Sequence, residues 1–342
     1  MRVRVASEED ECLWQDFVEA HPDACNYHRW KWKQVIERSF GWPAYYLLAE
    51  ENGRFAGILP LVLQKSWMFG RFLTSLPFFN YGGVLAENDS IEKALVQEAI
   101  TLARQLGADY IELRHRSEHP LGLREKTNKV AVELVVEPDE EKMLKSLRKQ
   151  TRNLVRKALK VGLRAEICGQ AALNDFYRVF AQNMRDLGTP VYSKSFLQEI
   201  WQGFPANTYL CLVRHEDEVI AASFMSGFRH RLEVIWGSSL RKYLSMAPNM
   251  LLYWRMLRFA AEKGFEVFDF GRSTAGSGAH RFKLQWSSQE IQLHWHYWLS
   301  QGNQLPELSP INPKFRMAIW TWRHLPLVIT NVLGPRIVRC LP

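Results

Sequence analysis

The chain has 342 residues, of which 47% are hydrophobic and 23% charged, and its formal net charge is +8. This composition excludes a disordered chain, and five cysteines are too few for a disulfide scaffold. No stretch approaches the roughly 18 consecutive apolar residues of a membrane-spanning helix. The positive charge and the 13 Trp indicate anionic partners, but they do not decide between nucleic acid, a phosphorylated metabolite and a membrane surface.

The N-terminus and the cysteines indicate a reducing cytoplasm. Acidic residues at 8–10 come too early for the apolar core of a secretory signal. No two cysteines form a Cys-x-x-Cys pair, so we expect free thiols rather than a zinc site or a redox dithiol. The five cysteines are Cys12, Cys25, Cys168, Cys211 and Cys340.

The first half of the chain is predicted to contain two helices, a hairpin, a helix and a strand. Apolar residues recur at helical spacing in the helices, Asn52-Gly53 marks the hairpin turn, and Gly107 ends the third helix. The predicted segments are 8–20, 27–40, 43–50 with 54–61, 94–107 and 108–114.

The second half repeats this pattern. Its hairpin turn is at Glu216-Asp217, and Gly264 ends its third helix directly before a strand that finishes near an arginine. The predicted segments are 171–185, 194–203, 208–214 with 219–224, 250–264 and 265–272. Gly107 and Gly264 are too far apart for a short solenoid unit, so we infer a repeat of a whole domain.

Each half is therefore predicted to have the order helix, helix, three strands, helix, strand. This order resembles that of an N-acyltransferase-like (GNAT) α/β domain. We predict two tandem GNAT-like domains with mixed sheets, at 1–138 and 139–300, and a basic aromatic tail at 301–342. The alternative is an unrelated pair of α+β domains.

A long basic helix is predicted over 139–162, at the start of the second domain. From Lys142 to Arg164 the chain has no acidic residue, and like charges four apart repel by about 0.2–0.5 kcal/mol per pair in an isolated helix. We infer that this face meets a polyanion, with Arg148, Arg152 and Arg156 as candidate contacts. The alternative is a solvated helix face. The expected buried stripe is Leu144, Leu147, Thr151, Leu154, Val155 and Ala158.

Neither half carries the glycine-rich loop with which acyl-CoA-dependent GNAT enzymes hold a pyrophosphate at a helix N-terminus. The corresponding segments, 241–249 and 85–90, contain no glycine. A glycine-rich segment does follow the last predicted strand, at 269–278, and Arg272, Arg281 and Lys283 lie around it. It lacks the Gly-Lys-Ser/Thr ending of a P-loop, and the alternative is a flexible connection.

His294 and His296 lie on one face of a predicted late strand. They could bind a metal there, but two histidines without a third ligand are more often structural, so we expect no metal. We also expect no cofactor.

Three segments, together with the tandem halves and the basic helix, resemble the FemABX-type aminoacyltransferases. They are Ser75–Gly83, Met184–Pro190, and Phe270–Thr274 with Phe282–Trp286. The closest resemblance is to the FemAB-like branch associated with bacterial exosortase/PEP-CTERM and exopolysaccharide loci, and it covers about residues 1–300.

This resemblance implies transfer of an aminoacyl group from aminoacyl-tRNA to an amine of a peptidoglycan or related envelope precursor, without acyl-CoA. It implies that Lys283, which follows Phe282, lies at the reacting centre, where a fixed cation stabilises an oxyanion. The alternative is a surface lysine on a short helix. Second-tier candidates for substrate binding are Arg272, Asn249, Tyr243 and Phe282 in the second half, and Asn80, Tyr81, Trp30 and Lys33 in the first.

The tail after Glu307 contains no acidic residue, and its arginines alternate with Trp320, Trp322 and aliphatic residues. Pro326 and Pro335 are expected to divide it into pieces too short to span a bilayer. We therefore expect either a segment lying on the anionic inner face of the cytoplasmic membrane or a tail packed on the domain.

Three functions remain open. The leading one is a FemAB-class N-acyltransferase whose partners are an acyl or aminoacyl donor and a phosphorylated envelope or polysaccharide precursor. The second is N-acyl transfer from acyl-CoA or an acyl carrier protein, and the third is a non-catalytic basic protein that binds RNA or lipid.

Overall fold

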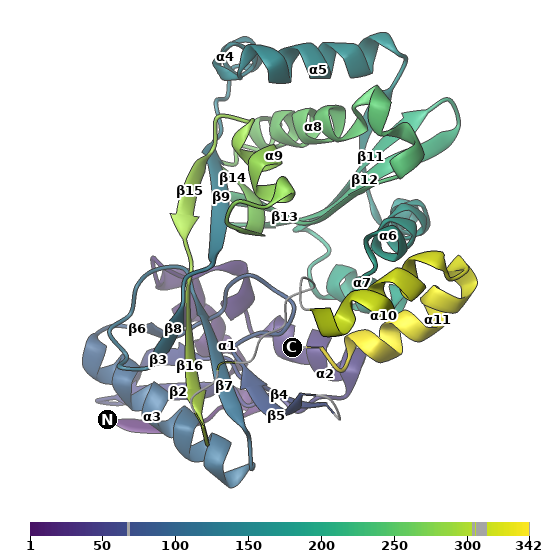
Figure 1. Cartoon of the computed structure of the whole chain (residues 1–342). Coiled ribbons are helices and arrows are strands. Elements are labelled where there is room, and N and C mark those ends of the chain that lie inside the picture. Colours follow the sequence, from purple (N-terminus) through teal and green to yellow (C-terminus); the bar gives the residue numbers. More distant parts are fainter. Residues whose placement is uncertain (67–68, 303–304, 306–312, 342) are drawn as a thin grey trace. The chain divides into compact units, whose positions relative to one another are not determined.

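The computed structural model describes residues 1–66, 69–302, 305 and 313–341. The chain forms two compact units, each assembled from segments that are separate in the sequence (Figure 1). Unit 1 comprises Met1–Lys129, Gln292–Ser309 and Ile337–Pro342, and unit 2 comprises Val130–Ile291 and Pro310–Arg336.

Unit 1 contains two sheets. The first has the strand order β1-β2-β3-β6, and the second has the order β4-β5-β7-β16-β8, in which β5 and β7 run parallel. Helix α3 packs against the hairpin β2–β3. The elements of unit 1 are β1 (Arg2–Val5), α1 (Glu11–Ala20), α2 (Lys31–Phe40), β2 (Leu47–Glu51), β3 (Arg54–Leu59), β4 (Val62–Ser66), β5 (Gly70–Thr74), β6 (Leu85–Ala86), α3 (Asp89–Gln105), β7 (Tyr110–His115), β8 (Arg124–Lys126) and β16 (His294–Leu299).

Unit 2 is built on one sheet with the strand order β10-β11-β12-β13-β14-β9-β15. Its elements are β9 (Lys129–Val135), α4 (Glu140–Ser146), α5 (Lys149–Lys160), β10 (Arg164–Cys168), α6 (Leu173–Leu187), α7 (Lys194–Gly203), β11 (Thr208–His215), β12 (Glu218–Phe228), β13 (Arg231–Ser239), α8 (Pro248–Glu262), β14 (Val267–Thr274), α9 (Gly278–Leu284), β15 (Gln289–Gln292), α10 (Pro313–His324) and α11 (Leu327–Val338). Short 3₁₀ helices lie at Glu8–Asp10, Asn26–His28, Gln170–Ala172 and Arg241–Met246.

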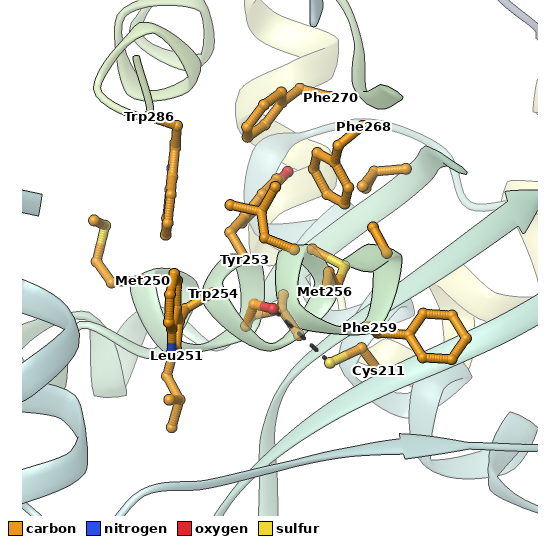
Figure 2. Packing of buried hydrophobic residues seen from close by; sticks show 14 of the residues in the cluster. Cys211, Met250, Leu251, Tyr253, Trp254, Met256, Phe259, Phe268, Phe270 and Trp286 are labelled. Atoms are coloured by element: carbon orange, nitrogen blue, oxygen red, sulfur yellow. Dashed lines mark hydrogen bonds between the residues drawn. The ribbon is translucent and has the colours of Figure 1, made fainter. Parts of the chain in front are cut away.

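Helix α8 carries the core of unit 2. Its side chains Tyr253 and Trp254 belong to a cluster that also contains Phe268 and Phe270 of β14 and Trp286, which follows α9 (Figure 2). The ring of Tyr253 stacks on that of Phe270 with centroids 5.5 Å apart. This cluster fixes β14 and α9 against the start of α8, and all three elements bear candidate site residues.

Local signals in the sequence account for several helix ends. The side chain of Asn88 accepts hydrogen bonds from the amides of Ser90 and Ile91 at the start of α3, and Ser193 accepts one from Phe196 at the start of α7. Helix α6 ends at Gly188, which has a φ of 79° that favours glycine. Both predicted hairpins form, as β2–β3 and β11–β12.

The predicted basic helix is wrong in one respect, because it is two helices. Leu147 and Arg148 have extended backbone between α4 and α5. Leu147 is 2% exposed, and the hydroxyl of Ser287 donates to the carbonyl of Ser146. Burial of Leu147 and this contact hold the chain out of helical geometry. Four members of the expected stripe, Leu147, Thr151, Val155 and Ala158, are buried, whereas Leu144 and Leu154 are partly buried.

The compact units do not coincide with the ranges expected from the sequence. Strand β9 precedes the expected boundary at 138 yet pairs in the sheet of unit 2, and β16 precedes the boundary at 300 yet pairs with β7 and β8 in unit 1. The tail also differs, because α11 continues through Pro335 to Val338. Pro335 lies near the end of that helix, where only one backbone hydrogen bond is lost.

Candidate active site

Strands β13 and β14 separate after a short parallel contact. They pair at only three positions, Arg231–Glu233 with Val267–Asp269, although β13 continues to Ser239 and β14 to Thr274. Glu233 and Asp269 are partners at the last of these positions. Both are buried, so a pair of carboxyl groups lies where the sheet begins to open.

The pairing also indicates which face this carboxyl pair occupies. Leu232 and Phe268 belong to the cluster around α8, so the adjacent pair, Glu233 and Asp269, lies on the opposite face of the sheet. That face is covered by α6, whose Asn183 donates to the hydroxyl of Ser238.

Lys283 is held against the end of β14. Its Nζ donates to the carbonyl oxygens of Gly271 at 2.8 Å and Arg272 at 2.9 Å, and the residue is 8% exposed. Gly271 has a φ of 72°, a conformation that favours glycine, and its amide donates to Asp269 Oδ1 at 2.7 Å. The glycine therefore lets the strand turn so that its carbonyl faces the ammonium group.

Burial lowers the pKa of Lys283 from 10.5 to about 8. The negative charges of Asp269 and Glu233 act in the opposite direction, and Arg272 adds to the lowering. Desolvation thus outweighs the attraction of two nearby carboxylates. Near neutral pH the group is a cation that loses its proton more easily than an exposed lysine.

The glycine-rich segment is an ordered turn into α9. Ser277 accepts a hydrogen bond from the amide of His280, Arg281 donates to the carbonyl of Gly276 at 2.6 Å, and His280 lies 2.7 Å from Glu290. The hydroxyl of Ser273 is buried and has no hydrogen-bond partner among the described residues. Buried hydroxyls are normally satisfied, so Ser273 is a candidate contact for a bound molecule.

The other candidate residues of the second half, Arg272, Phe282, Tyr243 and Asn249, each have different contacts. The backbone carbonyl of Arg272 accepts a hydrogen bond from Lys283 Nζ. Phe282 packs edge-on against Tyr253, with ring centroids 5.1 Å apart. The hydroxyl of Tyr243 donates to Glu218 at the start of β12. Asn249 lies in the first turn of α8, is partly exposed, and makes no side-chain hydrogen bond to a residue in the described part of the chain.

The candidates of the first half lie in unit 1 and do not form one polar group. Trp30 is 1% exposed and packs edge-on against Trp14 and Tyr46. Tyr81 and Asn80 are also buried. Lys33 forms ion pairs with Glu8 at 2.6 Å and Glu37 at 3.3 Å. These contacts give Trp30 and Lys33 structural roles, and an acceptor pocket in this half stays a prediction.

The three arginines of the basic helices differ in what they contact. Arg152 donates to the carbonyls of Lys145 at 2.7 Å and Leu147 at 3.1 Å, so it joins α5 to the end of α4. Arg148 is exposed at the start of α5. Arg156 is exposed and lines a cavity of about 250 Å³ with Arg255, Arg258 and Trp254 of α8. Arg255 forms an ion pair with Glu262, and Arg258 forms one with Glu140.

Sequence reasoning did not assign Glu233, Asp269 or Ser273 to the site. A signal for the first two was present, because each is a single acid between apolar residues of a strand, Leu232-Glu233-Val234 and Phe268-Asp269-Phe270. An acid at such a position must be buried or must face an opening.

Comparisons with known proteins bear on the fold. Residues 145–284 match the family described as an acetyltransferase (GNAT) domain. The match lies within the second half of the chain, and the chain has a tandem GNAT fold. Lys283 lies within the matched segment, and the prediction of two GNAT-like domains with mixed sheets is confirmed. A search of curated proteins found no similar sequence.

Solved structures resemble the tandem fold along most of the chain. A crystal structure of FemX has a TM-score of 0.66 at 15% identity and covers 86% of this chain and 97% of its own. A tandem GNAT protein from the clavulanic acid biosynthesis pathway has a TM-score of 0.59 at 11% identity, with coverages of 89% and 99%. L-PGS from Bacillus licheniformis has a TM-score of 0.56 at 12% identity, with coverages of 97% and 98%.

Proposed function

We propose that this acyltransferase moves an aminoacyl or acyl group onto an amine of a cell-envelope or exopolysaccharide precursor. The observation that carries the proposal is the buried ammonium of Lys283, held at the end of β14 where the GNAT sheet opens. The FemX-like fold and the segment before α8, a 3₁₀ helix without glycine, favour an aminoacyl donor such as aminoacyl-tRNA. The PEP-CTERM-associated branch stays a prediction.

In this proposal Lys283 is an electrostatic catalyst. The neutral acceptor amine attacks the carbonyl carbon of the aminoacyl ester, the carbon–oxygen bond to the ribose breaks, and the amine proton ends on the released hydroxyl. The ammonium group stabilises the oxyanion that forms on the carbonyl oxygen. Asp269 and Glu233 favour the charged form of Lys283, which burial alone would disfavour more strongly.

A second candidate is N-acyl transfer from acyl-CoA or an acyl carrier protein, which the GNAT family match favours. The two donors are separated by incubating the full chain with either tRNA charged with radiolabelled amino acids or radiolabelled acetyl-CoA. A detergent extract of bacterial envelope serves as the acceptor in both. We expect label to pass from the tRNA to the extract and Lys283→Ala to abolish this transfer. Transfer at the wild-type rate in Lys283→Ala would remove the catalytic assignment.

We further propose that the tail docks on an anionic membrane surface. Six large apolar side chains are exposed on α10 and α11: Met317, Trp320, Val328, Ile329, Val332 and Leu333. The four on α11 share one helix face, and Arg336 follows them one turn later. Because 308–342 has basic but no acidic residues, a second copy of this face would be repelled, whereas anionic lipid would be attracted.

The opposite side of the tail is packed within unit 2. Arg323 donates to the carbonyl of Leu187 at the end of α6, and Arg185 of α6 donates to the carbonyl of Leu325. Gly334 approaches Val191 so closely that a side chain there would meet its backbone. None of the described helices is long and apolar enough to cross a membrane.

A further inference from the structure

Five of the ten histidines of the chain gather at one end of β7 in unit 1. His115 ends β7, His294 is its partner on β16, and His296 lies two residues further along β16. His119 follows in the loop after β7, and its ring centroid is 4.2 Å from that of His115. The charge of His28 also acts on His115. All five histidines belong to unit 1, whereas the opening between β13 and β14 belongs to unit 2.

Two histidines of this cluster and Glu92 of α3 could share one ion. One ligand atom each of Glu92, His115 and His119 lie within 4.8 Å of one another. Around a tetrahedral zinc ion with bonds of about 2.0–2.2 Å, ligand atoms lie roughly 3.3–3.5 Å apart. Small side-chain shifts that bring His115 closer and separate the hydrogen-bonded pair of His119 and Glu92 would place all three on a metal. Two imidazoles and one carboxylate form a ligand set used by zinc enzymes that keep a fourth position for water.

A second group of residues holds His115 in place. Its Nδ1 lies 3.0 Å from Nδ1 of His296, whose Nε2 lies 3.9 Å from Glu125 Oε1. Glu125 also pairs with His294. Partners of this kind fix the orientation and tautomer of metal-binding histidines.

The three candidate ligands combine rigid and accessible positions. His115 and Glu92 are buried, whereas the side chain of His119 is 23% exposed. Solvent can therefore reach the cluster from the side of the loop. In the present arrangement hydrogen bonds satisfy the rings: the amide of Val84 donates to His115 Nε2 at 3.0 Å, and His119 pairs with Glu92. A purely structural network is therefore the competing explanation.

We propose that Glu92, His115 and His119 bind one divalent transition-metal ion of the zinc class, with His296 as a positioning residue for His115. The ion replaces hydrogen bonds of the present network and leaves a coordination position toward solvent. This differs from the sequence-based expectation of no metal, which considers the cysteines and the pair His294 and His296 but not Glu92, His115 or His119. His115 and His119 come from β7 and the loop that follows it, and the fold brings Glu92 of α3 to them.

The experiment titrates the full chain, freed of metal by a chelator, with Zn²⁺ and separately with Co²⁺. We expect one ion per chain, the visible absorption of four-coordinate Co²⁺, and a higher melting temperature of the zinc-loaded protein. His119→Ala should lower the affinity by about 100-fold or more, and His296→Ala by about 10–100-fold. Both variants are compared with wild type in the metal-free state by circular dichroism, which checks their folding.

His230→Ala is the matched control, because it removes an exposed histidine of unit 2 far along the chain from the cluster. It should bind Zn²⁺ as wild type does. Less than a tenth of an ion bound per chain at micromolar Zn²⁺ would overturn the proposal. Equal affinity of wild type and a folded His119→Ala would also overturn it, since the bound metal would then be an adventitious ion only.

Discussion

At the scale of single residues, Lys283 combines two opposing requirements. An oxyanion is stabilised best by a charged ammonium in a site from which water is excluded, but exclusion of water makes that charge less stable. The carbonyls of Gly271 and Arg272 and the carboxyl groups of Asp269 and Glu233 offset part of this cost. The result is a lysine with a pKa of about 8, close to the pH at which an enzyme works.

The activity should therefore depend on pH through Lys283. If the cation is the active form, kcat/KM falls as the pH rises through about 8, because the proton is lost there. Lys283→Arg keeps its charge at high pH, so any activity that it retains should not show this descending limb. The measurement is a pH profile of both proteins with the same donor. A limb that stays at the same pH in the arginine variant would show that another group titrates.

The stability of unit 2 should depend on pH through the same residue. The folded-state pKa lies below the unfolded value of 10.5, so the unfolded chain binds more protons between about pH 8 and 10.5. Stability contributed by this group therefore rises over that range, by about 3 kcal/mol, and is lowest below pH 8. Urea unfolding of wild type and Lys283→Met across pH 7–10.5 tests this. Parallel pH dependences of the two proteins would contradict it.

At the scale of helices and strands, the break between α4 and α5 changes how the basic segment is interpreted. One arginine of the predicted anion-binding face, Arg152, uses its guanidinium to hold the two helices together. Arg156 has no such role and faces a cavity beside α8. Charge reversal at Arg152 would therefore disturb the contact between α4 and α5 as well as any anion binding. Charge reversal at Arg156 tests anion binding alone.

Alanine substitutions should separate these two roles. Arg152→Ala should lower the free energy of unfolding by roughly 1–2 kcal/mol, because two carbonyls lose a charged donor. Arg156→Ala, the matched control four residues along the same helix, should change stability by less than about 0.5 kcal/mol. Denaturant unfolding measures both, and an equal loss in the two variants would refute the difference in role.

The sequence predicts elements whose signals are local and misses those that depend on distant partners. Helix α7 has its predicted bounds, 194–203, and in the structure Ser193 caps its start. The break at Leu147 depends on burial and on a contact from Ser287, and no local residue signals it. Lys283 was singled out from a family resemblance, but its carboxylate neighbours come from two separate strands. In the histidine cluster, His115 and His119 lie four residues apart in the sequence, but only the fold brings Glu92 and His296 to them.

At the scale of the whole molecule, the exposed apolar face of α10 and α11 should govern binding to lipid. Val328→Glu with Val332→Glu should abolish flotation with vesicles of mixed zwitterionic and anionic phospholipid, because two charges would enter the interface. Leu13→Glu, at an exposed leucine of α1, should float as wild type does. Flotation of the double variant at the wild-type level, or a concentration-dependent dimer that it abolishes, would contradict membrane docking.

The strand β16 has a consequence for how the two domains can be separated. It lies between β7 and β8 in the second sheet of unit 1, yet the chain reaches it only after it has completed the sheet of unit 2. A protein truncated after the first repeat would lack an internal strand and leave two edges unpaired. Synthesis from the N-terminus therefore cannot complete unit 1 until nearly 300 residues have been made. No single cut in the chain therefore separates a complete unit 1 from unit 2.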